Sequence, residues 1–98
     1  MDIEKQMDGK KLYVKLIGRL DTQTSPLLSE SLDEDLENVE DLTFDMAELI
    51  YISSAGLRVI LSTQKIMNKQ GSMKLINVQD IMQEVFDATG LSTILTIE

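Results

Sequence analysis

Two adjacent hydroxyl groups, on Ser53 and Ser54, are the groups of this chain best suited to chemistry. They join the short apolar pair Tyr51-Ile52 to a segment with helical spacing of apolar residues, 57–67. The first N–H groups of a helix lack intrahelical partners and give that end a partial positive charge. A serine there caps the helix, and a phosphate group is well tolerated. We therefore expect one serine to cap and its neighbour to be modified, although a cap with no further role is the commoner use of such a pair.

The remaining residues offer little for catalysis. Histidine and cysteine are both absent, which removes the commonest general base, the commonest metal ligand, disulfides and thiolate metal sites. Ser54 has no obvious base, and both the Gly-x-Ser-x-Gly turn and the Gly-x-x-x-x-Gly-Lys-Ser/Thr nucleotide loop are missing. We predict that the chain is not an enzyme and holds no metal ion or cofactor.

Charge and hydropathy restrict the partners. Nine basic residues against seventeen acidic ones give a formal charge of −8 at pH 7, which repels nucleic acid and anionic membranes. The acidity either keeps a small protein soluble or steers it to a basic partner. No apolar run approaches the ~20 residues that cross a bilayer, and no signal peptide opens the chain. With cysteine absent as well, we expect a cytoplasmic protein without direct membrane insertion.

The elements that must position the serines follow from periodicity. At 98 residues the chain is expected to form one domain, 1–98, with a single modest core. Thr24 or Ser25 is a good N-cap for a first helix, with Pro26 in its first turn, and Gly71 suits the C′ position of a second helix. The expected elements are strands 3–7 and 11–17 joined by an Asp8-Gly9 turn, a helix to about Glu37, strand 42–46, the helix begun by the serines, strand 73–78, helix 80–88 and a final strand 91–97. This order, β-β-α-β-α-β-α-β, predicts an α/β fold with a mainly parallel or mixed sheet.

The serine segment, 51–57, resembles the phosphorylation loop of the STAS family, the bacterial anti-sigma factor antagonists, whose pattern is aromatic-apolar-Asp/Ser-Ser-x-Gly-Leu. On that resemblance Ser54 matches the phosphorylated serine, and Ser53 stands where many relatives have aspartate. Three further segments match in order and spacing: Gly18-Arg19-Leu20-Asp21, the strand 42–46, and Phe86-Asp87-Ala88-Thr89-Gly90-Leu91, which has the form Phe-x-x-Ser/Thr-Gly-Leu. The resemblance implies a STAS domain with a mixed sheet of about four or five strands and helices mainly on one face.

The resemblance also implies a partner-switching cycle. The unphosphorylated protein would bind an anti-sigma factor that is also a serine kinase, phosphorylation of Ser54 would dissociate the complex, and a PP2C-type phosphatase would reset it. ATP and Mg²⁺ would belong to the kinase. Residues 21–25 are implied to lie beside the phosphorylated serine. The residues expected to contact the partner are Asp21, Thr22, Thr24, Ser53, Ser54, Ala55, Gly56 and Arg58.

Several residues have two possible roles at this stage. The missing side chain of Gly56 admits either an adjacent strand or a partner protein. Arg58 is either a solvated helix residue or a hydrogen-bond donor to a phosphoserine. Asp21 and Asp45 are expected at neighbouring strand ends, where they either bind a ligand or satisfy local N–H groups in Asx turns.

Two other functions stay open. In the first, the chain is a STAS-like subunit of a membrane transporter or a lipid-transport complex. In the second, it binds a small ligand or nucleotide at the strand ends near Asp21, Asp45 and Ser54.

Overall fold

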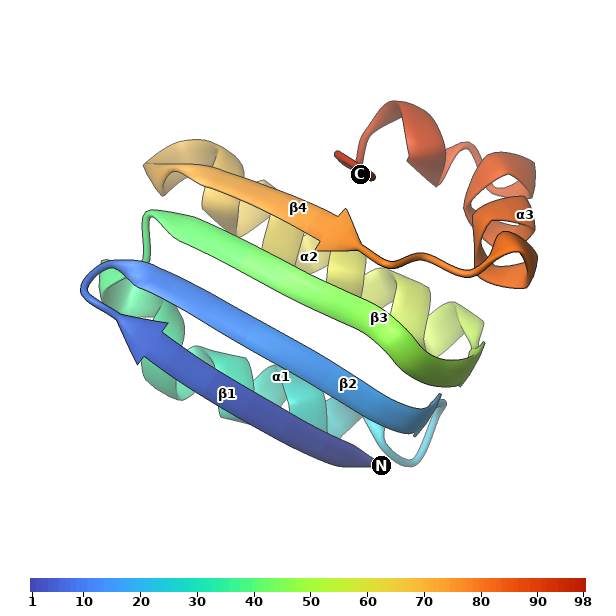
Figure 1. The fold of residues 1–98 in the computed structure, drawn as a ribbon, viewed down its shortest axis with the longest axis horizontal. Coiled ribbons are helices and arrows are strands. Elements are labelled where there is room, and N and C mark those ends of the chain that lie inside the picture. The colour runs from blue at the N-terminus through green and yellow to red at the C-terminus, as the bar shows by residue number, and fades with distance from the viewer.

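A four-stranded mixed sheet organises the computed structural model, which describes residues 1–98. The elements are β1 (Asp2–Asp8), β2 (Lys11–Leu20), α1 (Ser25–Asp35), β3 (Asp41–Ile52), α2 (Ser54–Gln70), β4 (Ser72–Ile76) and α3 (Asp80–Ala88), with short 3-10 turns at Leu36–Asn38 and Leu91–Thr93. The strands lie in the order β1-β2-β3-β4, with β1 antiparallel to β2 and the other pairs parallel. Helices α1 and α2 lie behind the sheet in Figure 1, and α3 lies beyond the end of β4. The predicted α/β class is confirmed.

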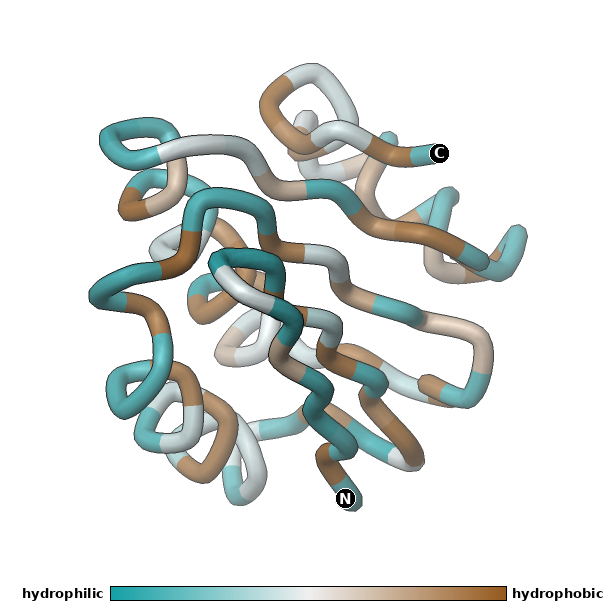
Figure 2. Tube along the Cα trace, turned by 60° about the vertical axis from the view of Figure 1, so that its left-hand side comes forward, coloured by the Kyte–Doolittle hydropathy of each residue, from teal (hydrophilic) through white to brown (hydrophobic).

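Alternation along the strands explains why the helices cover one face. In β2, Leu12, Val14 and Leu16 are buried, whereas the residues between them are partly exposed. The same alternation of hydrophobic and hydrophilic residues runs along the tube in Figure 2. Each buried leucine contributes roughly 1.5–3 kcal/mol by leaving water. The apolar face of the sheet therefore packs against the helices, and the opposite face keeps a polar surface.

Leucines at every fourth position place α1 against the sheet. Leu28, Leu32 and Leu36 are all buried in one cluster with Ile60 and Met67 of α2. The helix begins after Thr24, as the N-cap pattern predicts, and its α-helical part ends at Asp35. The last expected turn, to Glu37, is a 3-10 helix instead.

Strand β3 is longer than the sequence pattern indicates. It continues past Met46 to Ile52, and its last residues pair with β2 at Arg19↔Tyr51 and Leu20↔Ile52. On its other side, β4 pairs only with residues 41–45, and Asn77 turns the chain away with φ 56°. The expected strand 73–78 is thus shorter, ending at Ile76.

The predicted final strand, 91–97, is wrong. Leu91–Thr93 form a 3-10 turn, and a single parallel bridge joins Ile97 to Leu75 of β4. Gly90 reverses the chain with φ 77°, and both Leu91 and Leu95 are buried. That spacing of four buries one side of a helical turn rather than alternate residues of a strand, so packing outweighs the β-branched composition. The observed order is β-β-α-β-α-β-α.

Candidate functional site

The two serines have different positions at the N-terminus of α2. Ser53 is the N-cap residue, with extended backbone, and its Oγ accepts a 3.3 Å hydrogen bond from the N–H of Gly56. Ser54 is the first helical residue and is exposed. The capping hydroxyl is therefore engaged within the chain, while the Ser54 hydroxyl faces solvent in the field of the helix N-terminus.

Parallel pairing of β2 and β3 brings a second segment to the serines. The N–H of Ser53 donates a 2.9 Å hydrogen bond to the carbonyl oxygen of Leu20, continuing the ladder one residue beyond Ile52. The chain after Leu20 is the loop of residues 21–24 that precedes α1. Two segments more than 30 residues apart in the sequence thus form one edge of the molecule.

The loop of residues 21–24 is held by its own side chains. Asp21 accepts hydrogen bonds from the N–H groups of Gln23 (3.0 Å) and Thr24 (3.1 Å). The Thr24 hydroxyl accepts from the Asp21 N–H (2.8 Å) and donates to the carbonyl oxygen of Arg19 (2.8 Å). The bonds that the Asp21 carboxylate accepts, first the one from the Thr24 N–H, lower the pKa of Asp21, although desolvation opposes them. Asp21 is therefore an ionised Asx-turn residue, and Thr22 between these anchors is exposed.

Gly56 and Arg58 occupy opposite sides of α2. Gly56 is buried, and a Cβ there would lie 2.8 Å from Leu20 Cγ and 2.9 Å from Ile52 Cγ1. Of the two neighbours that the sequence left open for this glycine, the adjacent strands are the ones in contact. Arg58 is exposed and takes part in none of the ion pairs, and Ala55 is half-buried. The guanidinium is thus free for a ligand on the same helix face as Ser54, four residues earlier.

Asp45 lies elsewhere, and the prediction that it ends a strand is wrong. It is buried inside β3, paired with Lys15 and Ile76, because the strand continues for seven more residues. That length is about 23 Å at 3.3 Å per residue. The small-ligand hypothesis requires Asp21, Asp45 and Ser54 to lie close together at one site. The position of Asp45 inside β3 shows that they do not.

Asp45 instead joins β2, β3 and the residue after β4 on the open face of the sheet. Its carboxylate accepts hydrogen bonds from the hydroxyl of Tyr13, from Asn77 Nδ2 (3.0 Å) and from the N–H of Ala47 (3.0 Å). Burial acts to raise the pKa of Asp45, but these bonds together outweigh it and the pKa lies below its usual range. The same bond to Asp45 raises the pKa of Tyr13. The partners are 32 residues away on either side, so no local pattern reveals this cluster.

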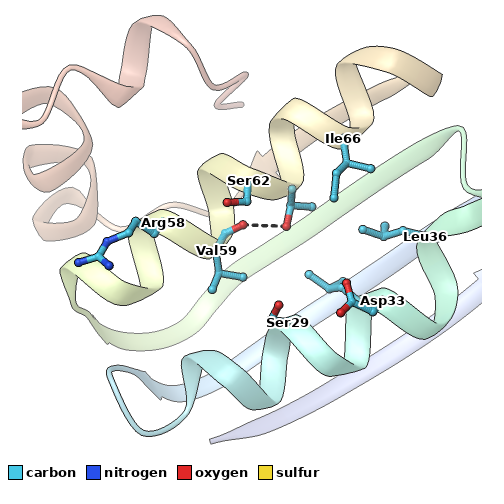
Figure 3. Close-up of a pocket in the computed structure, with 9 residues that line it drawn as sticks. Ser29, Asp33, Leu36, Arg58, Val59, Ser62 and Ile66 are labelled. Atoms are coloured by element: carbon cyan, nitrogen blue, oxygen red, sulfur yellow. Dashed lines mark hydrogen bonds between the residues drawn. The ribbon is translucent and has the colours of Figure 1, made fainter.

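A groove also lies between α1 and α2 (Figure 3). Ser29, Asp33 and Leu36 line one side, and Arg58, Val59, Ser62 and Ile66 line the other. Thr63 also lines the groove, and its hydroxyl donates a 2.8 Å hydrogen bond to the carbonyl oxygen of Val59 within α2. Neither Asp21 nor Ser54 lines this groove, and Arg58 is the one predicted site residue that does.

The chain belongs to the STAS family: the family model for the STAS domain matches residues 2–98. It is 32% identical over 98 residues to the anti-sigma-B factor antagonist of Bacillus subtilis (strain 168), covering 99% of this chain and 90% of that protein. It is 31% identical over 100 residues to the anti-sigma F factor antagonist of Paenibacillus polymyxa, covering 99% and 86%. The fold matches the anti-sigma factor antagonist SpoIIAA in its unphosphorylated form with a TM-score of 0.79 at 16% identity, covering 99% and 87%. None of the helices is both long and apolar enough to cross a membrane.

Proposed function

We propose that this protein is an anti-sigma factor antagonist whose binding is controlled by phosphorylation of Ser54. The observation that carries the proposal is the exposed Ser54 hydroxyl at the N-terminus of α2, beside the ordered loop of residues 21–24. The names of its relatives support the partner class, an anti-sigma factor. In this cycle the unphosphorylated protein binds an anti-sigma factor with serine kinase activity, and a PP2C-type phosphatase removes the phosphate. The cycle runs in the cytoplasm, and both catalytic activities belong to the partners.

The transfer step uses the Ser54 Oγ as nucleophile. A new bond forms between Oγ and the γ-phosphorus of ATP, the bond from that phosphorus to the ADP oxygen breaks, and the hydroxyl proton leaves to a base. The Ser54 side chain makes no hydrogen bond to a carboxylate of this chain, and under this proposal the kinase supplies the base as well as ATP and Mg²⁺. The products are phosphoserine, ADP and a proton.

The physical basis of the switch is the charge of the phosphate. A phosphoserine adds about −1.5 to −2 charges at pH 7. At the N-terminus of α2 this charge gains roughly 0.3–1 kcal/mol, so it does not unfold the domain. In a complex the dianion must instead be desolvated against a surface shaped for a hydroxyl. A penalty of ~3–4 kcal/mol at that interface weakens binding several hundred-fold.

Arg58 has a role in the phosphorylated state under this proposal. It lies four residues after Ser54 on α2, a spacing that places two side chains on the same helix face. Since its guanidinium has no carboxylate partner, it donates a charge-assisted hydrogen bond to the phosphate. This bond holds the phosphate against α2. It does not exist in the unphosphorylated protein and therefore does not contribute to the affinity of the unphosphorylated complex.

The test combines phosphorylation with binding. The protein is incubated with ATP, Mg²⁺ and the purified anti-sigma factor kinase of the same genome, and the phosphorylated residue is mapped by mass spectrometry. We expect phosphate on Ser54, unchanged binding for Ser54→Ala, and weaker binding for Ser54→Asp, whose single negative charge reproduces part of the effect of the dianion. Ser62 is an exposed serine further along α2, so Ser62→Asp is the matched control for charge. Phosphate on Ser53 alone, or equal binding by Ser54→Asp and the parent, contradicts the proposal.

A further inference from the structure

A second feature lies next to the serine site: an apolar groove between the end of β3 and α3. Six hydrophobic side chains line it and no polar one does: Ile50, Tyr51, Ile52, Ile81, Met82 and Val85. Ile50 and Ile81, on opposite walls, are each 65% exposed. Single exposed isoleucines are ordinary on a protein surface, but two that share one hollow with a half-exposed tyrosine form a contiguous apolar patch. Such patches mark interaction sites.

Both walls of the groove are held in place. On one side, the Gln79 side chain donates hydrogen bonds to the carbonyl oxygens of Ala47 (3.1 Å) and Leu49 (2.9 Å), which β4 leaves unpaired. These bonds fasten the start of α3 to β3. On the other side, the guanidinium of Arg19 stacks on the Tyr51 ring, 4.2 Å from its centroid. Because the walls are already ordered, little conformational entropy is lost when a ligand enters.

The groove is continuous with the edge that carries the serines. Ile52, at its inner end, contacts Gly56 of α2 and directly precedes Ser53. Tyr51 is three residues from Ser54, which is at most about 10 Å along the chain. A protein bound over Ser54 therefore reaches the groove without a long insertion.

Charge around the groove selects the kind of occupant. Asp80, Glu84 and Asp87 of α3 are all exposed, and Glu84 lies one helical turn from Ile81. Arg19, which stacks on Tyr51 of the groove, lies 3.9 Å from the carboxylate of Asp21, so its charge is partly compensated. A second copy of this chain would bring the same exposed acids of α3 and a further net charge of −8. Self-association through this face is therefore disfavoured, whereas a basic segment is attracted.

We infer that the groove binds an apolar side chain carried on a Lys/Arg-containing segment of the anti-sigma factor. The inference rests on the proposed function for the identity of the partner. Phosphorylation at Ser54 and docking in the groove then act on one interface. Burial of apolar surface in the groove contributes to the binding affinity, and the phosphorylation state of Ser54 determines whether the two proteins bind. The apolar side chain of the partner supplies most of the affinity. The acidic residues of α3 make the groove prefer a segment with basic residues next to that side chain.

The first test measures the affinity of variants for the anti-sigma factor. We expect Ile81→Ser to bind about tenfold more weakly, because its burial in the complex is lost. Ile94→Ser is the matched control, since Ile94 is 52% exposed and lies outside the groove. Glu84→Lys is compared with Glu30→Lys, an equal charge change on α1, and only the former is expected to weaken binding, less so at high salt.

The outcomes separate this inference from the proposed function. If Ile81→Ser binds like Ile94→Ser while Ser54→Asp binds weakly, the groove is not part of the interface and the inference fails alone. If Ser54→Asp binds like the parent while Ile81→Ser binds weakly, the groove stands and the phosphorylation switch fails. Unfolding curves of each variant establish that a loss of affinity is not a loss of fold.

A second test needs no natural partner. Isotope-labelled protein is titrated with a helical peptide of leucine and lysine, and separately with a peptide in which glutamate replaces lysine. The lysine peptide is expected to shift the backbone amide signals of residues 50–52 and 81–85, with an affinity that falls several-fold in Ile81→Ser. Equal shifts with both peptides, or shifts confined to other residues, would overturn the inference.

Discussion

Gly56 lies directly against Leu20: a Cβ on the glycine would be 2.8 Å from Leu20 Cγ and 2.9 Å from its carbonyl oxygen. The first turn of α2 therefore approaches β2 as closely as a bare backbone allows. The same carbonyl oxygen accepts the hydrogen bond from the Ser53 N–H. The position of the exposed Ser54 next to the loop of residues 21–24 thus depends on a contact that only glycine permits.

Gly56→Ala is expected to destabilise the fold by up to about 2 kcal/mol. Alanine favours the helix by about 1 kcal/mol, but overpacking against a carbonyl oxygen and two side chains costs about 1–3 kcal/mol, and the backbone must shift. Urea unfolding measures the change. Ser62→Ala, at an exposed site of the same helix, is the control and is expected to stay within about 0.5 kcal/mol of the parent. A Gly56→Ala variant more stable than the parent would show that the contact relaxes freely.

Ser53→Ala is expected to lower the free energy of unfolding by about 1 kcal/mol, because the N–H of Gly56 loses its capping oxygen. Ser53→Asp keeps an acceptor and adds a negative charge at the helix N-terminus, so its stability should equal or exceed that of the parent. Thermal unfolding of the three proteins gives the order. Equal stability of the alanine variant and the parent is the contrary result, since it means that the cap contributes nothing.

The free energy of unfolding is expected to fall at acidic pH because Asp45 becomes protonated. Its folded-state pKa is lowered, so the stability that its charge confers is present above the unfolded pKa of about 3.9 and is lost as pH falls through the folded value. Tyr13→Phe removes one donor, which should lower stability at neutral pH by about 1.5 kcal/mol and make the loss of stability below the unfolded pKa of Asp45 less steep. The measurement is chemical unfolding as a function of pH.

Tyr51→Phe is the matched control for this cluster. It also removes a phenolic oxygen, but from an exposed tyrosine whose hydroxyl has no hydrogen-bond partner in the chain. We expect its pH profile to follow that of the parent. If the profiles of Tyr13→Phe and Tyr51→Phe coincide, the bond to Asp45 does not contribute to acid stability.

Gln79→Ala is expected to loosen α3 more than it destabilises the whole fold. The variant loses two hydrogen bonds to β3 carbonyl oxygens, and the buried contacts of α3 with the core are the apolar ones of Met82 and Phe86. Amide hydrogen exchange in residues 80–88 should become several-fold faster, with exchange in β2 and β3 unchanged. Gln83→Ala loses only an intrahelical bond to Asp87 and serves as the control. Identical exchange in both variants would mean that Gln79 does not anchor the helix.

Local patterns predicted most of the elements for identifiable reasons. The alternation of Leu12, Val14 and Leu16 and the fourfold spacing of Leu28, Leu32 and Leu36 each report one buried face. The end of α2 at Gly71 was also predicted, but the reason differs: its φ is 172°, and a Cβ there would lie 1.9 Å from the carbonyl oxygen of Glu40. A close approach of two chain segments, rather than a left-handed cap, requires this glycine.

The sequence by itself determined the periodicity of strands and helices and the place of the serine pair at a helix start, because these depend on neighbours within about one helical turn or one strand. The tertiary structure decided which hydroxyl is exposed, the true length of β3, the buried carboxylate of Asp45 and the loss of the final strand. It also decided that Ile50 and Ile81 share one groove. The Asp45 cluster and the shared groove depend on contacts between residues some 30 positions apart, and chain proximity over such a span is set by packing of the whole sheet and not by local preference.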